Sequence, residues 1–143
     1  MSETATEKPA AQATAPSASF AFVKLVVRDL EPMLAFYGQV LGLVASQTIE
    51  TPEIIEKVLR KPGQETGATV ILYKSKDGSG GRQVGDAYGP VGFYVRDVDA
   101  AYAHALAEGA TGHREPFDTG NLRVAFVLDP EGREIELVSV RRP

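Results

Sequence analysis

The chain has 143 residues, of which 43% are hydrophobic, and its formal net charge is −4. These values fit one globular domain, and they exclude nucleic acid as a partner because phosphate binding needs clustered lysine and arginine. Cysteine is absent, which excludes disulfides and thiolate chemistry. No apolar run reaches the roughly 18 residues of a membrane-spanning helix, and the N-terminus lacks the pattern of a secretory signal. We therefore expect a cytoplasmic protein that does not bind membranes.

The first half of the chain shows the pattern strand, helix, strands. Residues 1–19 are rich in Ala, Thr, Pro and Ser and predict a disordered tail before a single domain over 20–143. An apolar run predicts a strand over 20–28, and Asp29 then predicts the N-cap of a helix that ends at Gly42. Strands are predicted over 43–50 and 68–75, whereas 54–60 fits a strand and a short helix equally well.

The second half repeats this plan after a linker rich in Gly, Asp and Ser over 76–89. Val27-Arg28-Asp29-Leu30-Glu31 returns as Val95-Arg96-Asp97-Val98-Asp99, each time between an apolar run and a segment with helical spacing. We therefore predict a strand over 91–96, a helix over 97–108, and strands near 112–115, 122–128 and 133–140. The sequence thus predicts an α+β fold of two pseudo-symmetric βαβββ modules, at about 20–75 and 90–140. Their helix-free faces are expected to enclose a cleft.

The repeated motif and the end of the chain resemble a known family. Its features are Val27-Arg28-Asp29-Leu30 followed by Phe36-Tyr37, and Val124-Ala125-Phe126 followed by residues 129–137 (DPEGREIEL). These stretches resemble the vicinal oxygen chelate superfamily, which includes glyoxalase I, bleomycin-resistance proteins, methylmalonyl-CoA epimerases and extradiol dioxygenases. The resemblance covers nearly everything from residue 20 to 140. It implies a cleft between curved mixed sheets, and a homodimer.

Metal-using members of that superfamily carry four ligands, which are His or Gln, Glu, His and Glu, one on each of four strands. Counting from the repeated aspartate, the resemblance places these positions at Phe22, Ile71 or Leu72, Pro90 and Glu136. Only Glu136 can coordinate a metal, and divalent ions in proteins need three or more oxygen or nitrogen donors. We therefore expect neither a metal nor another cofactor.

Strand alternation indicates which side chains line the cleft. Glu136 is the main candidate, because desolvation in an apolar cleft raises the pKa of a carboxylate and suits it to act as a base. The alternative is that Glu136 only neutralises Lys24 or Arg123. We expect the chemistry from Glu136, His113 and Tyr94, and contacts with a small-molecule ligand from Phe22, Lys24, Val26, Leu72, Lys74, Arg123 and Phe126.

Two functions from different classes are compatible with these residues. The first is a metal-independent isomerase, epimerase or lyase that acts on a small carbonyl or aromatic compound with Glu136 as its base. The second is a binding protein that sequesters a drug or metabolite, as the bleomycin-resistance branch does. We favour the enzyme, because a carboxylate and a lysine in an apolar cleft are costly to retain for packing alone. The apolar residues at the ligand positions disfavour a metal-dependent glyoxalase or dioxygenase.

Overall fold

The computed structural model describes residues 16–141, so most of the tail predicted over 1–19 lies outside the described residues. The first module consists of β1 (Phe22–Val26), α1 (Leu30–Gln39), β2 (Val44–Glu50), β3 (Ile54–Arg60) and β4 (Thr69–Ser75). The second consists of β5 (Val91–Tyr94), α2 (Val98–Ala107), β6 (Thr111–Thr119), β7 (Leu122–Leu128) and β8 (Glu134–Val140). The segment 54–60 is therefore a strand. Among residues 16–141, no helix is long and apolar enough to cross a membrane.

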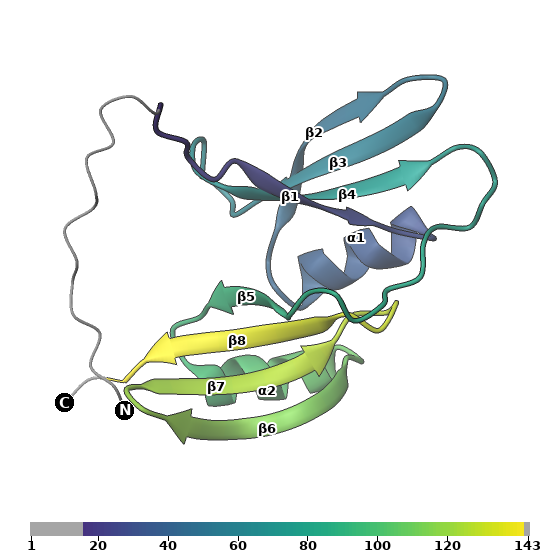
Figure 1. Ribbon diagram of the computed structural model, residues 1–143. Coiled ribbons are helices and arrows are strands. Elements are labelled where there is room, and N and C mark those ends of the chain that lie inside the picture. The colour runs from purple at the N-terminus through teal and green to yellow at the C-terminus, as the bar shows by residue number, and fades with distance from the viewer. Residues whose placement is uncertain (1–15, 142–143) are drawn as a thin grey trace.

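Each module forms one four-stranded mixed sheet, and the two sheets have the same topology (Figure 1). The strand orders are β1-β4-β3-β2 and β5-β8-β7-β6. In each sheet the first strand pairs in parallel with the fourth, and the remaining pairs are antiparallel. This repeated pattern confirms the α+β fold of two pseudo-symmetric βαβββ modules. It also leaves β1 and β5 as edge strands.

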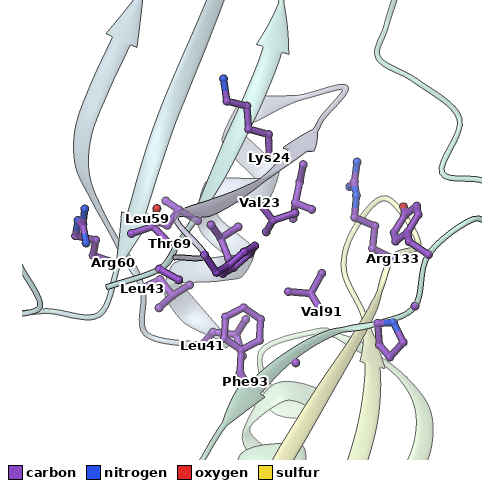
Figure 2. Close-up of a pocket in the computed structure, with 18 of the residues that line it drawn as sticks. Val23, Lys24, Leu41, Leu43, Leu59, Arg60, Thr69, Val91, Phe93 and Arg133 are labelled. Atoms are coloured by element: carbon purple, nitrogen blue, oxygen red, sulfur yellow. The ribbon is translucent and has the colours of Figure 1, made fainter. Parts of the chain in front are cut away.

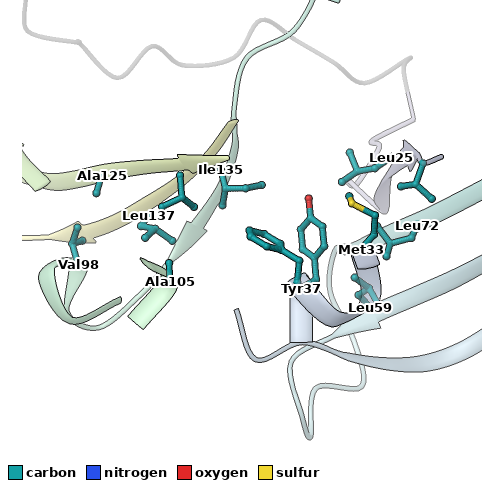
Figure 3. Packing of buried hydrophobic residues seen from close by; sticks show 13 residues of the cluster. Leu25, Met33, Tyr37, Leu59, Leu72, Val98, Ala105, Ala125, Ile135 and Leu137 are labelled. Carbon is teal, nitrogen blue, oxygen red and sulfur yellow. The ribbon is translucent and has the colours of Figure 1, made fainter. Parts of the chain in front are cut away.

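The hydrophobic core lies between each sheet and its helix and continues from one module to the other. Met33, Phe36 and Tyr37 are spaced so that they share one face of α1, and all three are buried. In Figure 3, Tyr37 lies between Met33 and Leu72 of its own module and Ile135 of the second module. Because one apolar cluster spans both modules, they are held together as well as stabilised individually.

A polar network at the turn after β7 also joins the two modules. Asp129 and Arg133 are both buried, and Asp129 accepts a hydrogen bond of 2.9 Å from the Tyr37 hydroxyl. Burial, together with the Asp129 carboxylate, raises the pKa of Tyr37 far above its usual value, so this hydroxyl remains a donor. Arg133 pairs with Asp129 and donates to the Val26 carbonyl in the first module.

The same turn supplies part of the N-terminal capping of α1. The Glu131 carboxylate accepts hydrogen bonds from the backbone amides of Arg28 and Asp29, at 2.7 and 3.1 Å. Asp29 is the N-cap residue as predicted, but its side chain makes no capping hydrogen bond. The side chain of Asp97, its counterpart in the second module, caps α2 through the Ala100 amide. The two predicted caps therefore differ, because only the first lies against the other module.

An arginine on β7 fastens α2 to the second sheet. Arg123 donates to both carboxylate oxygens of Asp99 on α2, at 2.8 and 2.9 Å, and to Asp118 on β6 at 2.9 Å. The hydrogen bonds from Arg123 hold the pKa of Asp99 below its usual value.

Folding lowers the pKa of Asp99. The Asp99 carboxylate therefore stabilises the folded state at pH values above the pKa of about 3.9 that it has in the unfolded chain. This contribution is lost as the pH falls through the lower folded value. We expect Asp99→Asn to be less stable than the native protein at neutral pH, and the difference to shrink in acid. Urea unfolding of both proteins between about pH 7 and pH 2 measures this. A difference that stays constant with pH would contradict it, and Glu115→Gln is the control.

Candidate functional site

In each module, one face of the sheet packs on the helix and the other is free of it. The register places Phe22, Lys24, Tyr73 and Glu56 together on the helix-free side of the first sheet, which we call the first open face. Tyr94, Glu136, Phe126 and Arg114 share the helix-free side of the second sheet, which we call the second open face. Phe22 and Tyr94 are 47% and 83% exposed.

The two open faces do not cover each other within one chain, since Phe22 and Tyr94 would then be buried. A cleft does lie between the two sheets, but much of its wall consists of edge strands and of residues on the helix-covered sides of the sheets. The expectation that the two open faces enclose the cleft is therefore wrong for the single chain. The reason is that α1 and the turn after β7 join the modules on their helix-covered sides.

The first open face carries an ion pair between Lys24 and Glu56. The Lys24 ammonium lies 2.5 Å from a Glu56 carboxylate oxygen, and Glu56 is only 5% exposed. The same ammonium lies 5.6 and 5.5 Å from the ring centroids of Phe22 and Tyr73, within the range of cation–π attraction. Lys24 is therefore already neutralised, and its predicted pairing with Glu136 is wrong within the described chain. Sequence reasoning missed Glu56 because the segment 54–60 fits a strand and a short helix equally well, so the side to which Glu56 points does not follow from the sequence.

The second open face carries Glu136 beside empty space. Glu136 is half-buried in β8, and its neighbours in register are Gly92 on β5 and Phe126 on β7. A Cβ atom added to Gly92 would meet no atom within 4 Å. Within residues 16–141, no hydrogen bond or ion pair engages the Glu136 carboxylate, and the cations expected to pair with it are bound elsewhere. This carboxylate is therefore available to a ligand in the space beside Gly92.

An arginine stacked on two aromatic rings lies on the same face. The guanidinium carbon of Arg114 is 4.1 Å from the ring centroid of Phe117 and 5.9 Å from that of Phe126. The two rings are themselves stacked, with centroids 6.4 Å apart. Arg114 pairs in register with Phe126, and Phe126 pairs with Glu136. The sheet therefore presents a cation, an aromatic surface and a carboxylate on three adjacent strands. Sequence reasoning missed Arg114 because its rings come from separate parts of β6 and β7.

His113 also reaches the second open face. Its Nε2 atom lies 2.9 Å from a carboxylate oxygen of Glu134, and both side chains are 43% exposed. Glu134 and Glu136 alternate along β8 and so point to the same side of the sheet. Of the residues expected to do chemistry, the structure thus brings Glu136 and His113 to one face, with Tyr94 at the end of β5 on that face.

Three of the expected ligand contacts lie elsewhere. Leu72 is completely buried beneath α1, because it pairs in register with Leu25 on the helix-covered side. Arg123 lies on the α2 side, engaged by Asp99 and Asp118. Lys74 donates to the Arg28 carbonyl at 2.8 Å and so supports the connection between β1 and α1. These corrections share one cause, which is that each of these side chains is held by its own module.

A cavity of about 970 Å³ lies between the edge strands β1 and β5 (Figure 2). We call it the intermodule cavity. Val23, Leu41, Leu43, Val91 and Phe93 surround its centre, and Arg60 and Arg133 lie on opposite sides of it. Of the expected site residues, Lys24, Val26 and Tyr94 line it, whereas Glu136 and His113 do not. The cavity therefore adjoins the second open face at Gly92 and Tyr94, but its lining does not include Glu136.

Comparison with known proteins agrees with this architecture. A family model described as the Glyoxalase/Bleomycin resistance protein/Dioxygenase superfamily matches residues 19–137. The chain belongs to this superfamily. Among solved structures of this fold, glyoxalase I of Leishmania major superposes with a TM-score of 0.75 at 24% identity, covering 86% of this chain and 87% of that one.

Two other proteins are similar to this chain, one in sequence and one in structure. The lactoylglutathione lyase of Salmonella typhimurium is 33% identical over 120 residues, covering 82% of this chain and 89% of that protein. Glyoxalase I of Zea mays has a TM-score of 0.74 at 22% identity over 86% of this chain. The chain spans less than half of the maize protein, since 44% of that chain is covered.

The residues present do not fit the metal that metal-using members of the superfamily hold. The positions that the resemblance gives for its ligands are Phe22, Ile71 or Leu72, Pro90 and Glu136, of which only Glu136 can donate. Across the described part of the chain, no three side chains of metal-binding type come together to hold an ion. A second copy of the chain would bring the same residues to these positions, so an arrangement that combines two chains would supply no further donors there.

Proposed function

We propose that this protein is a metal-independent enzyme that moves a proton on a small carbonyl compound. The observation that supports it most is the Glu136 carboxylate, which lies half-buried on the second open face beside the space at Gly92. A carboxylate in such a place takes a proton from the carbon next to a carbonyl, and general bases of this kind contribute about 10²–10⁴-fold to rates.

The neighbouring groups have matching roles. Glu136 takes the proton and an enolate forms, whose negative charge Arg114 stabilises from its place on the two rings. Return of a proton to the opposite face of the same carbon inverts it, return to the adjacent atom isomerises the compound, and loss of a leaving group instead completes a lyase reaction. The imidazole of His113, positioned by Glu134, supplies or removes the second proton.

The relatives suggest which substrate to test first. Proteins named lactoylglutathione lyase are about one-third identical to this chain. Lactoylglutathione is a thioester with a C–H group next to its carbonyl, and its peptide carboxylates match the cation of Arg114. We therefore propose lactoylglutathione and related 2-hydroxy carbonyl compounds as the substrate class.

Solvent exchange tests the proposal without knowledge of the product. Chelator-treated protein is incubated with lactoylglutathione in deuterium oxide, and the C–H signal beside the carbonyl is followed by proton NMR. We expect the signal to disappear with the native protein. In Gly92→Leu, where the new side chain fills the space beside Glu136, we expect exchange about a hundredfold slower. Gly89→Leu, outside the open face and equally free of contacts, is the matched control.

Two other results would replace the proposal. Exchange that requires added Ni²⁺ or Zn²⁺ would indicate a metal-dependent glyoxalase despite the donor set. Binding without exchange would indicate the sequestering protein, a second candidate that is favoured by the stacked surface of Arg114, Phe117 and Phe126. The exposed Phe22 and Tyr94 also fit the homodimer that the resemblance implies, and light scattering of the native protein tests this directly.

A further inference from the structure

The intermodule cavity has the size and walls of a ligand site. Its volume of about 970 Å³ is at the upper end of the roughly 300–1,000 Å³ found for small-molecule pockets. Figure 2 shows Leu41 and Leu43, which follow α1, facing Val91 and Phe93 on β5 across its centre. Apolar side chains from both modules thus form a continuous wall, along which an aliphatic chain loses contact with water.

Among residues 16–141, the charged side chains that line the cavity are all cationic. Its lining includes Lys24, Arg60, Lys61, Arg82 and Arg133 but no aspartate or glutamate of the described chain, although the chain as a whole is acidic. Lys24 is neutralised by Glu56, and its side chain extends away from the apolar centre in Figure 2. Arg133 is neutralised by Asp129 and Glu131. The remaining three form no ion pair with any residue of the described chain.

One hydrogen-bond donor of Arg60 has no partner within the described chain. This donor, the Nη1 atom, is buried. A buried donor without a partner is unfavourable by about 1–3 kcal/mol, and more for a charged group. Arg60 is followed directly by Lys61 at the end of β3, so two cations lie together at one side of the apolar wall.

We propose that the intermodule cavity binds a free fatty acid, with its carboxylate at Arg60 and Lys61 and its chain along Leu43, Leu41, Phe93 and Val91. The carboxylate is attracted by the two cations at this side of the cavity, and the chain covers apolar surface from both modules. This site goes beyond the proposed function, because Glu136 and Arg114 are not part of its lining.

Calorimetric titration of the full chain with dodecanoate and with dodecanol tests the headgroup without any substitution. We expect dodecanoate to bind about tenfold more tightly than the alcohol, and to raise the melting temperature as a ligand of the folded state does. Arg60→Gln is expected to remove this tenfold preference. Lys57→Gln, which alters another cation of β3 outside the lining, is expected to retain it.

Other outcomes of these titrations would overturn the proposal. Equal affinity for dodecanoate and dodecanol, or a preference that survives both Arg60→Gln and Lys61→Gln, would overturn the proposal. So would an absence of binding. A Val91→Phe variant, which fills the cavity, is expected to lose dodecanoate binding while keeping the native mass in light scattering. A changed mass would assign the cavity to a second copy of the chain. Glu136→Gln is expected to bind dodecanoate normally, so failure of the enzymatic proposal leaves this one standing.

Discussion

Replacing Asp129 with alanine is expected to lower the free energy of unfolding by about 3–5 kcal/mol, the cost of breaking a buried ion pair from one side. The Asp129 side chain is fully buried, and it accepts from the Tyr37 hydroxyl and from the backbone amides of Glu131 and Arg133. Its loss leaves the buried Arg133 with Glu131 as its one remaining acidic partner among the described residues. Because this network joins the modules, both should unfold at lower urea concentration.

Two further variants separate charge from packing. Asp129→Asn keeps the volume of the side chain and removes only the charge, so we expect it to be destabilised almost as strongly. Asp118→Ala breaks an exposed pair with Arg123 and is the matched control, with an expected change of about 0–1 kcal/mol. Equal stability of the Asp129 and Asp118 variants in urea unfolding would show that the turn does not hold the modules together.

Substitution of Glu136 by glutamine is expected to lower the rate of proton exchange about 10²–10⁴-fold, the usual contribution of a general base. The amide keeps the shape of the side chain and cannot take a proton, so ligand affinity should change little. Exchange measured by NMR gives the rate, and calorimetry gives the affinity.

Other carboxylates on the same sheet give the controls for this experiment. Glu134→Gln removes the partner of His113 and is expected to have a smaller effect, whereas Glu115→Gln is expected to have none. Undiminished exchange in Glu136→Gln would exclude Glu136 as the base and direct attention to His113. A loss of affinity without a loss of rate would give Glu136 a binding role.

Strand alternation and the repeated motif predicted which side of the sheet several candidate residues occupy. They placed Glu136 on the helix-free side of the last strand, and they placed Lys24 with Phe22 on the helix-free side of the first. They did not predict which side chains form ion pairs with each other. Lys24 and Glu56 lie on strands that are not adjacent in the sheet, and Arg123 turns toward a helix, so both pairings depend on how segments far apart in sequence align.

The sequence by itself determined the two βαβββ modules, the turn after β7, and the apolar residues at three of the four positions where the resemblance places metal ligands. These features depend on local periodicity, on residues with special backbone preferences and on side-chain chemistry, all of which can be read along the chain. Only the tertiary structure decided that the open faces do not meet within one chain, that Arg114 stacks on Phe117 and Phe126, and that a cavity separates β1 from β5. These features depend on strand register, on the bulges of β6 and on the docking of two modules, and no local pattern in the sequence specifies them.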